Sequence, residues 1–337
     1  MKLISIVNSS LNHAGSKAPA DIINILKDEY KENVSLETLD LALNNSKSKL
    51  VSKTENFLLK IKFLSKLFFD KQLKVIQYPI KPIQLLRFFP GNKTIVLIHD
   101  LVGLRYLNSK DEKKEIKYLS KFKYIIAHNE HMKKYLIDKG ISSDKIYVLE
   151  LFDYLVDNNV NVTNRNSELI LDYVGNLVEL KCPFIYELGN SHNFLMNLYG
   201  NGLEKEIHNT KYMGSFKPDE LPNKLQGNYG LVWDGKCDES DEESMYKNYT
   251  KYNNPHKLSC YMAAGLPVIV WRKSAVADFV KKYNVGYIIN SLDEIDSINT
   301  NDYNEKKKNV QAIRNNVING YYTRRVFKSI LENNKNK

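Results

Sequence analysis

Cysteine is scarce in this 337-residue chain, and long apolar segments are missing. The three cysteines, Cys182, Cys237 and Cys260, show no paired spacing, which argues against a disulfide framework and against a zinc site. No apolar run has the length of a membrane span, and the N-terminus becomes polar too early for a signal peptide. The phosphate-binding patterns GxxxxGK(S/T) and GxGxxG are also absent. These absences favour a cytoplasmic enzyme.

The composition is that of a folded protein with two domains. Hydrophobic residues make up 43% of the chain and aromatic residues 11%, enough to build sizeable cores. The length exceeds that of an ordinary single domain. The formal net charge of +10 fits nucleic acid, an anionic membrane surface or anionic ligands. Because the lysines are scattered among carboxylates and no nucleic-acid-binding signature occurs, we expect no nucleic-acid partner.

Short runs rich in β-branched residues alternate with helical patterns along the whole chain. Buried strands separated by helices favour a mostly parallel sheet with helices on both faces. The expected strands are 3–7, 74–78, 94–99, 124–127, 169–174, 194–199, 230–233, 268–271 and 286–289. The pattern predicts an α/β fold.

A polar, Asn-rich stretch within residues 153–167 predicts a linker. We therefore expect one Rossmann-like domain over residues 1–155 and a second over 168–318. The terminal segment, 319–337, is expected to form a helix that crosses back to the first domain. Two such domains place a ligand cleft near the carboxyl ends of their strands.

The most informative segment spans residues 252–271. Its polar start contains Asn254 and the cation Lys257, a short helix follows, and a Gly-Leu-Pro turn leads into an apolar strand. A helix N-terminus and a lysine aimed at one point suit an anionic group such as a diphosphate. The alternative is an ordinary helix–turn–strand unit with a surface lysine.

A second candidate for phosphate binding follows the strand expected at 169–174. Gly175 and Asn176 form a turn, and Lys181 lies a few residues beyond it. Glycine lets the backbone approach a ligand closely. Lys181 and Lys257 together would offset the charge of a leaving diphosphate, a task that otherwise falls to a metal.

Two Gly-Ser pairs lie where backbone groups can meet a ligand. Gly15 and Ser16 precede a helical pattern, so the N–H groups of the helix start can bind a phosphate or a sugar hydroxyl. Gly214 and Ser215 lie in an aromatic run suited to holding a base. The alternatives are a simple N-cap at Ser16 and a plain loop at Gly214.

The strand expected at 94–99 ends in His99 and Asp100, with Arg105 shortly beyond. A carboxylate at a strand end can act as general base on an acceptor hydroxyl, with His99 or Arg105 orienting the substrate. Gln77 and Asn129 lie at two other strand ends and suit sugar hydroxyls. Alternatively, Asp100 caps the following segment and the other side chains are loop residues.

Two charged segments are predicted to have structural rather than functional roles. Residues 234–243 are acidic but lack the order of an EF-hand, so they are predicted to be a solvated charge run rather than a metal loop. The amphipathic helix expected at 55–69 is predicted to pack on the first sheet. Peripheral association of this helix with an anionic membrane is the alternative.

Several motifs, in their order and spacing, resemble one group of bacterial glycosyltransferases. The group comprises the glucosyltransferases that add the second sugar to serine-rich-repeat adhesins and the related β-1,6-galactofuranosyltransferases. The motifs extend over nearly the full length and are Gln77-Tyr78-Pro79, Ile98-His99-Asp100, Leu151-Phe152-Asp153-Tyr154, Val174-Gly175-Asn176, Gly230-Leu231-Val232-Trp233, the Lys257 segment and Tyr321-Tyr322-Thr323-Arg324-Arg325.

The resemblance implies a GT-B fold, with two Rossmann-like domains facing across a cleft, the donor on the C-terminal domain and the acceptor on the N-terminal one. It implies transfer of a hexose, glucose first, from a UDP-sugar to a sugar hydroxyl on a glycosylated protein such as a GlcNAc-modified adhesin. The UDP-sugar is a co-substrate, no metal or cofactor is expected, and the enzyme would be a cytoplasmic homo-oligomer. The family's nucleotide contacts fall on Gly15-Ser16, Lys181, Gly214-Ser215 and Lys257.

The chain departs from the family at two points. Lys181 stands where the family has an arginine, which keeps the charge but loses the bidentate fork. The Glu-x7-Glu pattern of many GT-B enzymes is missing, and only Asp278 lies nearby. The alternatives for function are a galactofuranosyltransferase of surface polysaccharide synthesis and a non-catalytic GT-B partner subunit.

Overall fold

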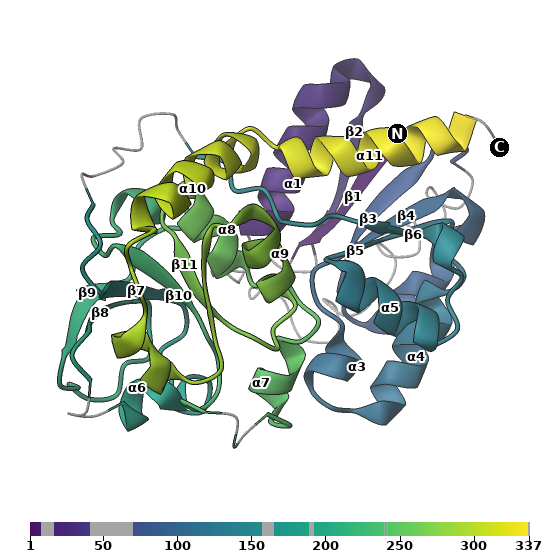
Figure 1. The fold of residues 1–337 in the computed structure, drawn as a ribbon. Helices are drawn as coiled ribbons and strands as arrows, with labels where there is room; N and C mark the ends of the chain where they lie inside the picture. The colour runs from purple at the N-terminus through teal and green to yellow at the C-terminus, as the bar shows by residue number, and fades with distance from the viewer. Residues whose placement is uncertain are drawn as a thin grey trace, which may run out of the picture. The chain divides into compact units, whose positions relative to one another are not determined.

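The computed structural model describes residues 1–7, 17–40, 70–156, 165–188, 192–238, 240 and 242–335. The chain divides into two compact units, the first comprising Met1–Leu149 with Arg324–Lys337 and the second Glu150–Thr323. Each unit is built on a six-stranded sheet whose strands pair in parallel, with helices around it (Figure 1). The predicted α/β class with two Rossmann-like units is confirmed.

The strands of the first sheet lie in the order β2-β1-β3-β4-β5-β6. Its central strand β4 is buried along its whole length, as its continuous apolar sequence predicts. The elements of this unit are β1 (Lys2–Val7), α1 (Lys17–Tyr30), β2 (Ser35–Asp40), β3 (Lys74–Tyr78), β4 (Thr94–Ile98), α3 (Val102–Arg105), α4 (Ser109–Leu119), β5 (Tyr124–Ala127), α5 (Glu130–Asp138) and β6 (Ile146–Val148).

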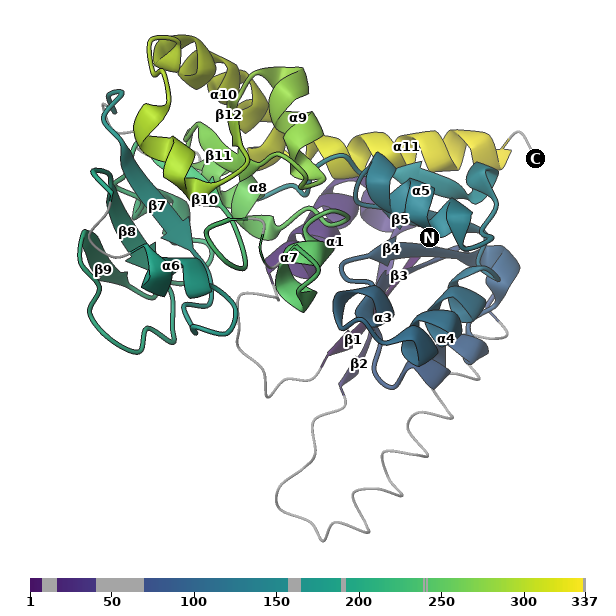
Figure 2. The same cartoon turned by 60° about the horizontal axis from the view of Figure 1, so that its bottom comes forward.

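The second sheet has the order β12-β11-β10-β7-β8-β9, which can be followed in Figure 2. Its elements are β7 (Ile170–Val174), α6 (Pro183–Glu187), β8 (Leu195–Tyr199), β9 (Thr210–Gly214), β10 (Tyr229–Val232), α7 (Met245–Tyr249), α8 (His256–Ala263), β11 (Val268–Trp271), α9 (Val276–Tyr283), β12 (Gly286–Ile289), the 3-10 helix η7 (Leu292–Ser297) and α10 (Tyr303–Ile318). Among the described helices, none is long and apolar enough to cross a membrane.

The sequence pattern located the central strands and missed three others. The strands expected at 74–78, 124–127, 268–271 and 286–289 have these bounds in the structure. The missed strands, β2, β6 and β9, each lie at an edge of a sheet. β2 and β9 mix polar with apolar residues and so lack the apolar run that marks a central strand, whereas β6 is only three residues long.

The close packing of α8 on the second sheet depends on a glycine. A Cβ on Gly230 of β10 would lie 2.2 Å from the ring of Tyr261 in α8, so a larger residue would push the helix away. The Tyr261 hydroxyl accepts a hydrogen bond from Val174 N (2.9 Å) and donates one to the Leu231 carbonyl (3.1 Å). These contacts fix α8 relative to the ends of β7 and β10.

The chain passes between the two units twice, at Leu149–Glu150 and within helix α11, Tyr321–Lys335. Within the second unit, the buried carboxylate of Asp153 accepts hydrogen bonds from Tyr322 N (3.1 Å) and Thr323 N (2.7 Å). It thereby satisfies backbone N–H groups at the start of α11. The first crossing precedes the linker expected within residues 153–167, and the second lies within the terminal segment 319–337.

Candidate active site

Lys257 lies in the first turn of α8, just after Pro255, whose side chain offers no cap to the helix. Its Nζ donates hydrogen bonds to Asp234 Oδ1 (2.9 Å), the Trp233 carbonyl (3.0 Å) and the Tyr173 hydroxyl (3.2 Å). The ammonium also lies 4.3 Å from the centre of the Tyr173 ring, a cation–π contact. The side chain is only 8% exposed, so Lys257 is not the surface lysine of the alternative interpretation.

The charges around Asp234 favour an ionised pair. Burial would raise the pKa of Asp234, but the positive charges of Lys257 and Lys181 outweigh it and hold that pKa below its usual value. Burial lowers the pKa of Lys257, and the carboxylate of Asp234 opposes this. Two lysines around one carboxylate leave a net positive charge, which attracts an anion.

The prediction of a solvated charge run at 234–243 is wrong for Asp234. The Asp234 side chain is 15% exposed and paired with Lys257, and Glu242 is paired with Lys251 (2.8 Å) and Lys273 (2.6 Å). The one available signal was position, because Asp234 comes two residues after the end of the buried strand β10. Among the residues that the structure describes, no group of His, Cys, Asp and Glu side chains could hold a metal ion.

A pocket lies against this ion pair, entirely within the second unit. Both members of the pair contribute to its wall, together with residues from β10, β11 and the segments around α7 and α9. The lining residues are Val232, Trp233, Asp234, Thr250, Pro255, Lys257, Trp271, Ser274 and Val276. Its volume is about 10 Å³, room for roughly one water molecule, and it lies beside the start of α8 and the Lys257–Asp234 pair.

The turn after β7 carries three of the predicted residues. A Cβ on Gly200, at the end of β8, would lie 1.8 Å from the Gly175 carbonyl oxygen, so the two strand ends touch through their backbones. The Asn176 side chain accepts a hydrogen bond from Val178 N (3.1 Å) and shapes the turn that leads to Lys181. The structure therefore brings the Gly-Asn turn and both lysines to one end of the second sheet.

The other three predicted positions in this unit have different surroundings. Gly214 ends β9 with φ of +101°, and its carbonyl accepts a hydrogen bond from Gly200 N (3.0 Å), while Ser215 is exposed. Asn254 is buried, and its Nδ2 donates to the Glu150 carbonyl (2.9 Å). Asn254 thus ties the segment before α8 to the first residue of the unit.

In the first unit, the predicted residues form two pairs. His99 Nε2 lies 2.6 Å from Gln77 Oε1, and Gln77 Nε2 donates to the Pro19 carbonyl (3.0 Å), so the ring nitrogen donates to the amide oxygen. Asp100 Oδ2 pairs with Arg105 Nη1 at 2.7 Å, with the two side chains 30% and 31% exposed. Arg105 is thus a partner of Asp100, a pairing that the sequence analysis did not predict.

Three predicted positions remain. Asn129 is the N-cap of α5, where its Oδ1 accepts a hydrogen bond from Met132 N (2.9 Å). Gly15 and Ser16 lie outside the described residues, as does the helix expected at 55–69.

Glu115 of α4 is a buried carboxyl group that the sequence analysis missed. Its Oε1 accepts hydrogen bonds from the Tyr78 hydroxyl and Val102 N, both at 2.7 Å, and its Oε2 accepts one from Gly103 N (3.2 Å). It therefore fixes the start of α3, the short helix that follows Asp100. The sequence around it is rich in lysine and glutamate, and the signal available was its place one turn before the buried Leu119.

Because Glu115 is buried, we expect the stability of the protein to depend on pH. Burial raises the pKa of Glu115 to about 7, against the effect of its hydrogen bonds. The folded protein then keeps a proton that the unfolded chain releases near pH 4.5, so the free energy of unfolding falls as pH rises from about 4.5 to about 7. We expect Glu115→Gln to flatten this fall by about 2 kcal/mol in urea unfolding across that range. An unchanged slope would contradict the prediction.

Solved structures with the same arrangement of elements are GT-B glycosyltransferases. HepE of Anabaena, crystallised with UDP and glucose, matches 98% of this chain and 100% of its own with a TM-score of 0.63 at 11% identity. A glycosyltransferase of Rickettsia africae matches 100% of this chain and 99% of its own with a TM-score of 0.59 at 12% identity. The fold is therefore GT-B.

Sequence comparison identifies the family. Residues 1–151 match the N-terminal domain of glucosyltransferase 3-like proteins, and residues 171–330 match their C-terminal domain. Beta-1,6-galactofuranosyltransferase WbbI of Escherichia coli K12 is 32% identical over 354 aligned residues, covering 100% of both chains. Glucosyltransferase 3 of Streptococcus parasanguinis is 27% identical over 245 residues, 70% of this chain and 69% of its own. The chain belongs to the glucosyltransferase 3-like family of glycosyltransferases, which confirms the resemblance read from its motifs.

Proposed function

We propose that this protein transfers a hexose from a UDP-sugar to a sugar hydroxyl on a glycan or glycoprotein. The observation that carries the proposal is the buried Lys257–Asp234 pair at the start of α8, with Lys181 close enough to act on both charges. The excess positive charge and the helix N-terminus suit the diphosphate of UDP. HepE, which has the same fold, was crystallised with UDP and glucose.

In this proposal the second unit binds the donor and stabilises the leaving group. Negative charge grows on the diphosphate as the bond to the sugar breaks, and Lys257 and Lys181 offset it in place of a metal. The preorganised lysines need no rearrangement of solvent at that moment. Gly175, Asn176, Gly214 and Ser215, at the strand ends of the same unit, would contact the rest of the nucleotide sugar.

The first unit binds the acceptor. Asp100 takes the proton of the attacking hydroxyl, and Arg105, held by Asp100 at 2.7 Å, and the His99–Gln77 pair orient the sugar. The oxygen then attacks the anomeric carbon, the bond to UDP breaks, and direct displacement inverts that carbon. We propose that the enzyme works in the cytoplasm as a homo-oligomer, as its family resemblance implies.

Glucose and galactofuranose remain the two candidate sugars. Glucose, with a GlcNAc-modified adhesin as acceptor, follows from the resemblance to the adhesin glucosyltransferases. Galactofuranose is favoured by the full-length match to WbbI at 32% identity, against a partial match to glucosyltransferase 3 at 27%. Donor trials separate them, because the two sugars share the diphosphate site and differ only beyond it.

The test is thermal unfolding with UDP, GDP, UDP-glucose and UDP-galactofuranose, each with and without a chelator. A ligand that binds only the folded state stabilises it, by about 2.7 kcal/mol when the ligand concentration is a hundred times its Kd. This stabilisation raises the melting temperature. We expect UDP and one UDP-sugar to raise it and the chelator to have no effect. No shift with any nucleotide at millimolar concentration would reject the proposal and favour a non-catalytic partner subunit.

A further inference from the structure

The loop after β10, residues 233–238, is held by hydrogen bonds from neighbouring elements. Gly235 N donates to the Lys181 carbonyl at 3.2 Å. Farther along, Cys237 N donates to the carboxylate of Glu187 in α6, also at 3.2 Å. These bonds fix the loop to α6 and to the segment that carries the second lysine of the site.

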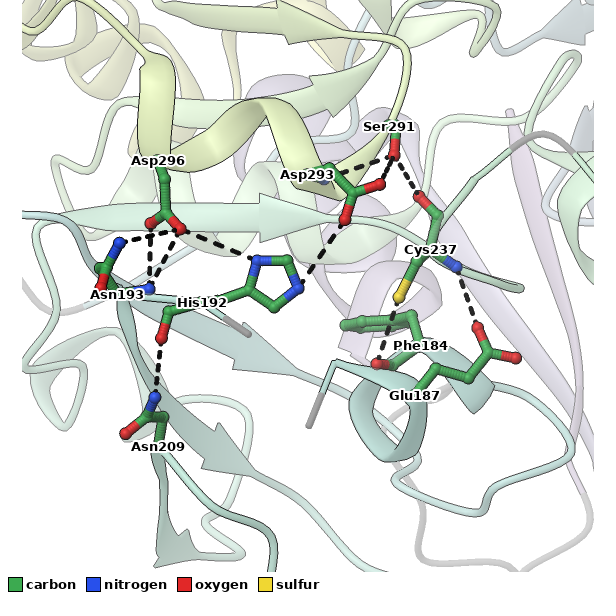
Figure 3. Close-up of polar contacts among 9 residues, drawn as sticks. All are labelled: Phe184, Glu187, His192, Asn193, Asn209, Cys237, Ser291, Asp293 and Asp296. Atoms are coloured by element: carbon green, nitrogen blue, oxygen red, sulfur yellow. Dashed lines mark hydrogen bonds and ion pairs between the residues drawn. The ribbon is translucent and has the colours of Figure 1, made fainter. Parts of the chain in front are cut away.

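The far end of the loop is braced by η7 (Figure 3). The Cys237 carbonyl accepts a hydrogen bond from the Ser291 hydroxyl at 3.4 Å. Asp293 and Asp296 of the same helix lie 3.8 and 3.9 Å from the two ring nitrogens of His192, just before β8. The 3-10 helix η7 therefore connects the loop after β10 to the segment just before β8.

The buried side chain of Lys247 binds two backbone carbonyl groups of the loop. Lys247 Nζ donates to the carbonyls of Lys236 and Asp238, both at 2.9 Å. It also lies 4.0 Å from the ring centre of Trp233 and 5.0 Å from that of Trp271. With so many anchors, the carboxylate at the head of the loop is preorganised.

All three N–H groups of the Lys257 ammonium already donate hydrogen bonds within the protein. An ammonium has three donors, and they are directed to Asp234, the Trp233 carbonyl and the Tyr173 hydroxyl. A phosphate oxygen that binds Lys257 must displace or share one of these acceptors. Asp234 is the acceptor that carries the same charge as phosphate, so the two repel each other when they share the lysine.

We propose that Asp234 is a built-in competitor of the diphosphate for Lys257. It holds the lysine in place while the site is empty, and it weakens the grip on UDP so that the product can leave. This inference rests on the proposed function, because it takes the diphosphate of UDP as the competing anion. Among the described residues, Asp234 is the carboxylate bonded to Lys257, so without it UDP would meet no competing charge there and would bind more tightly.

The test is isothermal titration of UDP and of uridine into the wild-type protein, Asp234→Asn and Asp238→Asn. Asp238→Asn removes the same charge from the same loop, but Asp238 makes no bond to Lys257. We expect Asp234→Asn to bind UDP about tenfold more tightly, or about 1.4 kcal/mol. Uridine lacks the phosphates, so its affinity should not change, and Asp238→Asn should behave like the wild type. Turnover assays should show stronger product inhibition by UDP in Asp234→Asn.

The outcomes separate this inference from the function on which it rests. Weaker or unchanged UDP binding by Asp234→Asn, with normal binding by the wild type, overturns the inference alone. Failure of the wild type to bind UDP overturns the proposed function and the inference with it. If Asp234→Asn binds uridine as well as UDP more tightly, competition between Asp234 and the diphosphate is also contradicted, because uridine has no phosphates.

A second variant covers the case in which Asp234→Asn does not fold. Tyr173→Phe keeps every charge but removes the hydroxyl that donates to Asp234 (3.2 Å) and accepts from Lys257 (3.2 Å). Lys257 then has one acceptor fewer, and we expect a smaller gain in UDP affinity, about threefold. A loss of UDP affinity in this variant would overturn the competition.

Discussion

Lys257→Ala is expected to abolish sugar transfer and to destabilise the second unit by about 3–5 kcal/mol. Transfer fails because the diphosphate loses the cation at the start of α8 that balances its growing charge. Stability falls because Asp234, only 15% exposed, is left as a buried carboxylate without its ion-pair partner. Turnover of the UDP-sugar and urea unfolding measure the two effects separately.

The double variant Lys257→Ala with Asp234→Asn distinguishes the loss of function from the loss of stability. Removing the stranded carboxylate should restore most of the free energy of unfolding but none of the transfer. Lys273→Ala is the matched control, since its side chain is 43% exposed and its pair with Glu242 contributes about 1 kcal/mol or less. A double variant as unstable as Lys257→Ala would show that Asp234 is not the source of the instability, and restored transfer would remove Lys257 from catalysis.

The sequence revealed the positions whose chemistry is local. Lys257 could be found because it precedes a Gly-Leu-Pro turn and an apolar strand, and both features lie within a few residues of it. Central strands such as β4 could be found because they are apolar throughout. The edge strands β2, β6 and β9 and the burial of Asp234 could not, because they depend on neighbours that lie far away in the chain. The Tyr173 hydroxyl that contacts Asp234 is 61 residues away.

Sequence reasoning also found polar residues without finding their partners. The place of Asn129 after a strand predicts a sugar ligand, and in the structure its oxygen caps α5, a role that Asn favours at helix starts. Glu115 was overlooked because its helix looks solvent-exposed, although tertiary packing turns one glutamate of that helix inward. Whether a polar residue acts on a ligand or on its own backbone is decided by packing, which a single sequence does not record.

Asp100→Asn is expected to lower kcat/KM by about 10²–10⁴-fold while leaving the protein folded. An amide cannot take the proton of the acceptor hydroxyl, so the attacking oxygen stays a poor nucleophile. The fold should survive because the Asp100 side chain is 30% exposed, and a pair of that exposure with Arg105 contributes about 1 kcal/mol or less. The measurement is kcat/KM against pH, where the limb that reports ionisation of the base should disappear in the variant.

Arg105→Gln decides whether Asp100 acts as a base or only holds Arg105, since the two are bonded at 2.7 Å. If Asp100 only positions the arginine, both single variants and the double variant should lose the same activity and keep the same pH profile. If Asp100 is the base, Arg105→Gln should mainly raise KM for the acceptor and retain the acidic limb. We expect the second pattern, because a guanidinium has no basic site at neutral pH and the carboxylate beside it does. A wild-type rate in Asp100→Asn would remove Asp100 from the chemistry and leave the acceptor's proton to another group.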